Sequence, residues 1–226
     1  PQIWSAVTGE ISNVTYMTGS RSTYVEMDLK SADALFVVFS DEADKRLRHR
    51  ATEPLPLRSD TIASPWRVVF GRKMGTPDAI VMDSLKSYID TTLAIANPAE
   101  ARAVKYFSGT ATYHNSFFLG AVDSARTYRI DLGTVNYMAE VWVNGKYCGL
   151  TWFSPHSIDI SAAVNSGENT LEIRVTNPWK NRICGDKLAK AGETTYTWTS
   201  YPWSKKTKNI LMPAGLLGPV TITLYK

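Results

Sequence analysis

The stretch Val141–Tyr147 reads VWVNGKY and decides the fold class. Apolar side chains alternate along it until Asn144-Gly145 interrupts the pattern. Asn-Gly between apolar flanks supplies the two positive-φ residues of a type I′ turn. The stretch therefore predicts a β-hairpin, with one strand on each side of the turn.

The same strand-like pattern extends over most of the chain. Strands are expected at Trp66–Phe70, Ala79–Asp83, Val104–Phe117, Tyr128–Leu132, Met138–Val143, Lys146–Leu150, Ser157–Ile160, Thr170–Val175 and Pro219–Tyr225. One capped helical turn is expected at Asn97–Glu100, where Asn precedes Pro and Glu stands at the third position. Many short strands separated by Gly, Pro and Asn predict an all-β sandwich or jelly roll.

The pattern is broken once, between two regions of strands. Tyr24–Leu29 alternates and Ala34–Phe39 is a short apolar run, and both are typical of strands. The charged, Pro-bearing stretch that follows predicts a boundary. We therefore expect strands of a separate small β unit in residues 1–45, a linker in 46–60 and a jelly-roll sandwich in 61–226. Asp41–Arg50 also fits one short helix, because its acidic residues precede the basic ones.

Composition excludes several classes of protein. A net charge of +4 is too small to indicate a nucleic-acid partner. No apolar run approaches the roughly 20 residues that span a bilayer. Because the chain starts at Pro1 with no signal peptide, we expect a fragment or a processed product.

Cys148 and Cys184 leave two alternatives open, a disulfide in an oxidising compartment or two free thiols.

No catalytic set stands out in the sequence. There is no phosphate-binding loop, no Cys-x-x-Cys, no His-Glu-x-x-His and no Gly-x-Ser-x-Gly, and the three histidines are scattered. Glycosidases need two carboxylates about 5–9.5 Å apart, which a sequence alone cannot bring together. The carboxylates considered are Asp83, Asp123, Asp131, Glu140, Asp159 and Asp186. We expect no catalytic residue and no cofactor, and no ligand cluster locates a structural calcium ion.

Aromatic side chains are the unusual feature, with seven Trp and eleven Tyr. Trp66 and Trp142 lie inside expected strands and are predicted to be core. The C–H faces of sugars stack on aromatic rings, and their hydroxyls bind polar side chains that carry neighbouring donors or acceptors. Aromatic residues in loop-like sequence beside such polar residues are therefore candidates for carbohydrate contact. The candidate carbohydrate contacts are Trp152, His156, Trp179, Asn181, Arg182, Asp186, Trp198 and Trp203. The alternative is that the loop Trp rings plug the open end of the sandwich.

The segment Asn177–Ala214 is long for a β-connection and rich in rings and basic residues. It is expected to fold over one end of the sandwich. Arg182 and Asp186 are expected to form an ion pair or clamp there. They are four residues apart, so they meet only if the segment is helical or tightly turned.

A resemblance emerges from several motifs in order. They are Tyr106–Tyr113, Ile130–Val135, Ala139–Gly145, Asp159-Ile160, Asn169–Asn177 and Gly215–Val220. Their order resembles the sugar-binding jelly-roll domain of family-two glycoside hydrolases, the β-galactosidase and β-glucuronidase class. Asn177–Asp186 resembles the Asn-Arg-x-x-Gly-Asp stretch in the C-terminal region of large bacterial α-L-rhamnosidases. Ile3–Gly9 and Ser31–Phe39 resemble the β-domain that precedes the jelly roll there.

The resemblance implies a galactose-binding-like, non-catalytic accessory domain of a secreted, periplasmic or cell-surface enzyme of polysaccharide degradation. Its partners would be a plant or host glycan and a catalytic barrel of the same polypeptide, absent from this sequence. We expect the chain alone not to hydrolyse aryl glycosides. Two alternatives stay open, an independent carbohydrate-binding module and a structural brace between domains.

Overall fold

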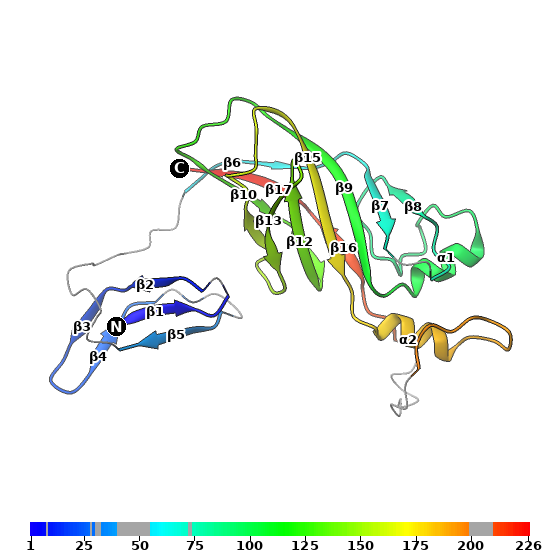
Figure 1. The fold of residues 1–226 in the computed structure, drawn as a ribbon, viewed down its shortest axis with the longest axis horizontal. Helices are drawn as coiled ribbons and strands as arrows, with labels where there is room; N and C mark the ends of the chain where they lie inside the picture. Colours follow the sequence, from blue (N-terminus) through cyan, green and yellow to red (C-terminus); the bar gives the residue numbers. More distant parts are fainter. Residues whose placement is uncertain (8, 28, 30–32, 40–54, 72–73, 199–209) are drawn as a thin grey trace. The chain divides into compact units, whose positions relative to one another are not determined.

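The computed structural model describes residues 1–7, 9–27, 29, 33–39, 55–71, 74–198 and 210–226. The chain divides into two compact units, Pro1–Pro54 and Leu55–Lys226. Figure 1 shows strands in both units and short helices in the second. The expected all-β class is confirmed.

The first unit contains five short strands. They are β1 (Gln2–Ser5), β2 (Ile11–Asn13), β3 (Tyr16–Thr18), β4 (Thr23–Val25) and β5 (Leu35–Val38). An antiparallel sheet has the order β2-β1-β5, and β3 pairs with β4. None of the described residues of this unit is buried. Its strands therefore close no hydrophobic core within the part of the chain that is described.

The second unit is a sandwich of two antiparallel sheets. The six-stranded sheet has the order β13-β12-β15-β9-β7-β8, and the four-stranded sheet has the order β14-β10-β17-β6. The first contains β7 (Trp66–Phe70), β8 (Ala79–Met82), β9 (Thr110–Leu119), β12 (Met138–Val143), β13 (Lys146–Thr151) and β15 (Gly167–Thr176). The second contains β6 (Pro56–Thr61), β10 (Thr127–Asp131), β14 (Ser157–Asp159) and β17 (Thr221–Tyr225). A smaller pair joins β11 (Thr134–Asn136) to β16 (Gly215–Gly218).

Alternation along the strands builds the core between the two sheets. Along β15, Leu171, Ile173 and Val175 are buried and face inward, as period-two geometry requires. Ile130 of β10 and Ile222 of β17 join the same cluster from the opposite sheet. The expected β-sandwich is thus confirmed.

A ring cluster fills the interior beside β7 and β9. Tyr113 and Tyr88 are fully buried, and the Tyr113 hydroxyl donates to that of Tyr88 over 2.6 Å. The backbone N–H of Leu216 donates to the same Tyr113 oxygen over 3.0 Å. Burial raises the pKa of both tyrosines well above its ordinary value. Both hydroxyls stay neutral and hydrogen-bonded, which removes most of the cost of burying them.

The hairpin predicted from VWVNGKY is present. β12 and β13 pair antiparallel with Val143 opposite Lys146, and Asn144 and Gly145 have φ of 52° and 74°. The Asn144 amide also donates to the carbonyl of Ala163 over 2.9 Å. The turn is therefore fixed by both its backbone and its side chain.

Several details differ from the sequence-based expectations. Residues 56–60, expected in a linker, belong to β6, because their backbone pairs with β17. The strand expected at Val104–Phe117 begins only at Thr110. Helix α1 (Pro98–Lys105) occupies the preceding residues, capped by the Asn97 side chain as predicted. Trp142, expected in the core, is only half-buried because it points to the outer face of its sheet.

Four elements of the second unit were not expected at all. They are β6, β11, β16 and helix α2 (Lys180–Lys187). β11 is three residues long and follows a glycine, and β16 is four residues long and contains two glycines. Both strands are therefore too short to show an alternation of apolar and polar residues. α2 contains Gly185 and no apolar stripe, which hides a helix from a periodicity argument.

Candidate functional site

Helix α2 directly follows β15 and lies at one end of the sandwich (Figure 1). The backbone N–H of Arg182 donates to the buried Ser108 hydroxyl over 3.2 Å. A Cβ placed on Gly185 would lie 2.7 Å from Cγ of Tyr106, so only glycine permits this close approach. The helix is therefore held against the loop that precedes β9.

Arg182 and Asp186 form an ion pair within α2. Nη2 of Arg182 lies 2.8 Å from Oδ1 of Asp186, and both side chains are more than nine-tenths buried. The predicted clamp is confirmed, and it forms because the segment is helical and places positions i and i+4 on one face.

Asp186 also holds the chain that returns past the helix. Its Oδ2 accepts the backbone N–H of Tyr196 over 3.1 Å and that of Thr197 over 2.7 Å. The Thr197 hydroxyl donates to the same oxygen over 2.6 Å. The Arg182 guanidinium carbon lies 5.2 Å from the centre of the Tyr196 ring. One buried carboxylate thus fixes residues 196–197 against α2.

Two further contacts hold the rest of this segment. The Asn181 side-chain amide donates to the Met212 carbonyl over 2.8 Å and accepts the Met212 N–H over 2.9 Å. From α1, Nη2 of Arg102 lies 3.3 Å from Oε2 of Glu193. Asn181 is therefore a buried structural clamp rather than a group open to a ligand.

Two of the Trp residues that were predicted to contact a carbohydrate lie near α2 and are exposed to solvent. Trp198, next to the clamped residues, is 90% exposed, and Trp179 at the start of α2 is 47% exposed. The Trp198 ring therefore does not plug the sandwich. A hollow of about 130 Å³ beside it is lined by Ile183, Asp186, Lys187, Thr195, Thr197 and Trp198. Trp203 lies outside the described residues.

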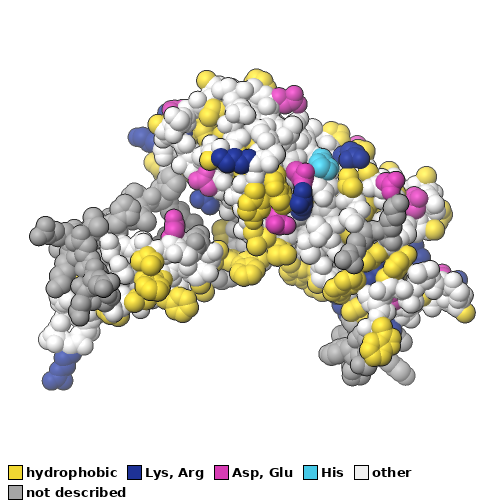
Figure 2. Space-filling model, in the orientation of Figure 1, with side chains coloured by type: hydrophobic (Ala, Val, Ile, Leu, Met, Phe, Trp, Pro, Cys, Tyr) yellow, Lys and Arg dark blue, Asp and Glu magenta, His cyan; other side chains and the backbone are white. Residues whose placement is uncertain are grey.

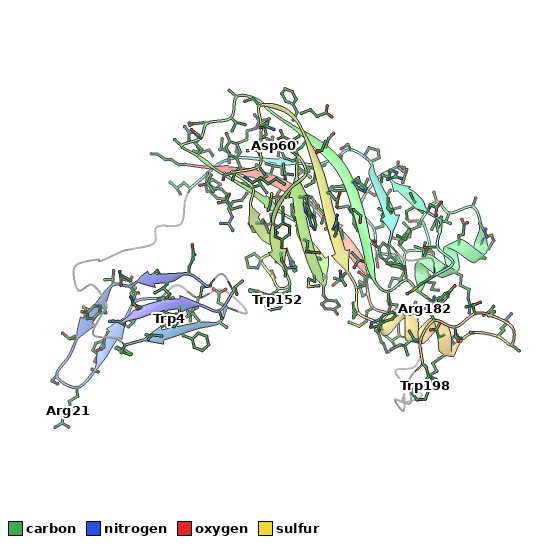
Figure 3. The ribbon with its side chains drawn as sticks, viewed as in Figure 1. Trp4, Arg21, Asp60, Trp152, Arg182 and Trp198 are labelled. Atoms are coloured by element: carbon green, nitrogen blue, oxygen red, sulfur yellow. The ribbon has the colours of Figure 1, made fainter. Side chains whose placement is uncertain are left out.

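Trp152 and His156 form a separate group after β13. Figure 3 shows Trp152 at the end of that hairpin, well apart from Arg182 and Trp198. Trp152 is 60% exposed, whereas His156 is buried with Nδ1 3.1 Å from the Thr151 hydroxyl. Burial lowers the pKa of His156, and the Asp131 carboxylate opposes that shift. The eight expected contacts thus do not form one site.

Neither cysteine is bonded to the other. Cys148 is half-buried and Cys184 is buried, and both are free thiols. Burial raises the pKa of each thiol. Of the two alternatives left open by the sequence, the structure has the free thiols.

The described ranges contain no group of three or more His, Cys, Asp or Glu side chains placed to hold a metal ion. Among the same residues, no helix is long and apolar enough to cross a membrane. The expectations of no catalytic residue, no cofactor and no metal stay predictions.

Residues 85–212 match the family model described as the glycosyl hydrolase 2 galactose-binding domain-like family. The chain belongs to this family. The match contains α1, α2 and the six-stranded sheet from β9 onward, so the expected family-two type of domain is confirmed.

This galactose-binding-like chain is similar to a rhamnosidase from Novosphingobium sp. PP1Y, with 33% identity and a TM-score of 0.75. The similarity covers 99% of this chain and 20% of the rhamnosidase chain. A "Putative beta-glucuronidase" of Formosa agariphila is 34% identical over 188 residues, which cover 72% of this chain and 15% of that protein. The chain therefore spans a small part of both relatives, as an accessory domain does.

A β-glucuronidase from Ruminococcus gnavus, solved with D-glucuronic acid, shows the same fold at lower similarity. Its identity is 16% and its TM-score 0.50, over 74% of this galactose-binding-like chain and 29% of the other. This likeness concerns the fold alone.

Several residues that shape the site of this galactose-binding-like domain were missed from the sequence. Thr197, Met212 and Arg102 each contact α2 or its returning chain, yet they lie 11 to 91 residues from their partners. Two of the contacts use backbone N–H groups, which every non-proline residue has. No sequence signal could have singled these residues out.

Proposed function

We propose that this galactose-binding-like domain is a non-catalytic part of a bacterial glycoside hydrolase and presents Trp198 to the glycan bound by that enzyme. The full protein would place the catalytic carboxylates on a separate barrel. Support for this context comes from the rhamnosidase, of which this chain matches one fifth at 33% identity. We also propose that the protein is secreted, periplasmic or at the cell surface, where polysaccharide is degraded.

The observation that carries the proposal is an exposed indole that directly follows a clamped stretch of backbone. A buried ion pair and three hydrogen bonds to Asp186 fix residues 196–197, and the next residue, Trp198, is 90% exposed. Exposed large apolar surface on a fixed support is typical of a binding site. The apolar C–H face of a sugar ring would cover the indole.

The polar surroundings of the ring suit the same ligand. The hollow beside Trp198 is lined by Lys187, Thr195 and Thr197 as well as by Ile183. The ammonium group donates hydrogen bonds to sugar hydroxyls, and the threonine hydroxyls can donate or accept them. A rhamnoside or a glucuronide is the substrate class that the two relatives point to.

The test is substitution of Trp198 in the full-length enzyme, assayed with aryl rhamnosides and aryl glucuronides. Trp198→Ala should raise KM or lower kcat while the melting temperature changes little, because the ring is exposed. Trp198→Phe keeps an aromatic face and should retain most of the activity. Phe118→Ala removes an exposed ring outside the α2 segment and serves as the matched control.

Two results would contradict the proposal. If Trp198→Ala lowers stability and leaves the kinetics unchanged, the ring serves packing. If neither property changes, the segment has no part in substrate binding and the domain acts as a structural brace.

A further inference from the structure

The solvent-facing side of the six-stranded sheet carries a row of polar and aromatic side chains. The strand register places Trp142 of β12 opposite Glu172 of β15, Glu172 opposite His114 of β9, and His114 opposite Arg67 of β7. Their neighbours along each strand are buried, apart from the partly exposed Asn115, so these four side chains share the outer face. Figure 2 shows acidic, basic and hydrophobic side chains gathered with a histidine over the middle of this sheet.

The row borders a hollow of about 480 Å³. The side chains that contribute to its lining include His114, Asn115, Trp142, Thr170, Glu172 and Arg174. It lies next to the β12–β13 turn, because Gly145 also contributes. None of the residues that line it also lines the hollow beside Trp198, so the two hollows are distinct.

The groups in the hollow are already held in place. The Arg174 guanidinium carbon lies 4.1 Å from the centre of a Trp142 ring, and its Nη2 lies 2.7 Å from Oε1 of Glu172. The exposed Tyr147 ring lies 5.1 Å from Trp142. An arginine oriented by a ring and a carboxylate loses little freedom when it binds a ligand.

The chemistry of the hollow selects a neutral ligand with many hydroxyls. Glu172 pairs with Arg174, so the guanidinium charge is compensated and an anion gains little there. The pair still offers acceptor and donor sites side by side, which suits the neighbouring hydroxyls of a sugar. The four strands of the row span three spacings of about 4.8 Å, or about 14 Å, which exceeds one sugar ring.

We propose that this outer face of the six-stranded sheet is a second binding site that takes a neutral oligosaccharide chain. Glu172 and Arg174 bind its hydroxyl groups, and Trp142 and Tyr147 supply the apolar contact. Such a site would anchor the enzyme to a polysaccharide independently of the Trp198 segment. The inference does not depend on the function proposed for that segment.

The test uses the 226-residue chain in affinity gel electrophoresis, followed by titration calorimetry. The probes are soluble galactan, xyloglucan, glucomannan and arabinoxylan, with polygalacturonate as the acidic comparison. At least one neutral polysaccharide should retard the chain. Glu172→Gln and Arg174→Lys should each weaken that binding about tenfold or more, because the first removes the charge of the acceptor and the second removes the planar set of guanidinium donors.

The controls separate this site from its surroundings. Glu168→Gln makes the same change on the exposed side of the same strand, outside the hollow, and should bind as the parent does. Phe118→Ala removes an exposed ring of β9 outside the hollow and should also bind normally. Unchanged melting temperatures confirm that each variant is folded.

Four results would overturn the proposal. The first three are no retardation by any neutral probe, unchanged binding by both Glu172→Gln and Arg174→Lys, and a preference for polygalacturonate. The fourth is binding by this chain that disappears in the full-length enzyme, because another domain then covers the face.

Discussion

Replacing Asp186 with Ala tests the clamp that shapes the α2 segment. The change leaves the Arg182 guanidinium buried without its carboxylate, and Nε of Arg182 has no hydrogen-bond partner in the described part of the chain. Removing one member of a buried pair costs about 3–5 kcal/mol. The N–H groups of Tyr196 and Thr197 lose their acceptor as well.

The loss should be local, because this segment lies outside the sandwich core and can detach while the core stays folded. Hydrogen exchange at the amides of Tyr196 and Thr197 is therefore the right measurement. A loss of about 3 kcal/mol corresponds to exchange about a hundredfold faster. The urea midpoint of the whole domain should shift less than the exchange data imply.

Two further variants test whether the buried ion pair is the cause of the loss. Glu193→Gln breaks the Arg102 pair, whose side chains are more than 40% exposed, and should cost at most about 1 kcal/mol. The double variant Arg182→Met with Asp186→Leu leaves no buried charge unpaired and should lose less stability in urea than Asp186→Ala does, although the amides of Tyr196 and Thr197 stay without their acceptor. Unchanged exchange in Asp186→Ala, or a double variant that equals the sum of the two single losses, would refute the clamp.

Two other predictions concern stability. Asn97→Ala should lower the free energy of unfolding by about 1 kcal/mol in urea titrations, because the Asn97 side chain caps α1 by accepting the Ala99 N–H over 2.9 Å; an unchanged value would show that α1 adds nothing to global stability. The pKa of His156 in the folded chain lies below its ordinary value of 6.5, so near that pH only the unfolded chain takes up the proton. The contribution of His156 to stability is therefore present above about pH 6.5 and is lost as the pH falls. Urea titrations at about pH 7.5 and pH 5.5 should show this loss, and His156→Asn should reduce it, whereas an equal loss in the variant would assign it to other groups.

Local patterns were sufficient for the elements whose cause is local. The Asn144-Gly145 turn, the Asn97 cap and the alternating strands follow from φ preferences, one side-chain hydrogen bond and period-two burial. The ion pair between Arg182 and Asp186 could also be predicted, because residues four apart can meet where the segment is a helix or a tight turn. That the segment is a helix was not, because α2 lacks an apolar stripe.

The site depends on contacts that no local pattern contains. Trp142 and Trp66 both lie in alternating strands, yet Trp66 is 1% exposed and Trp142 points outward. Alternation states that neighbours face opposite sides, but not which side becomes the core. The register across the sheet decides that, and so places Trp142 beside Glu172.

The sequence by itself determined the all-β class, the hairpin, the family and the pair of charges in the α2 segment. The tertiary structure alone decided that Trp198 is exposed, that Asp186 holds residues 196–197, and that Trp152 lies away from them. The physical reason is the range of the forces. Turns, caps and alternation depend on neighbouring residues, whereas burial and long-range hydrogen bonds depend on which strands and loops the completed sandwich brings together.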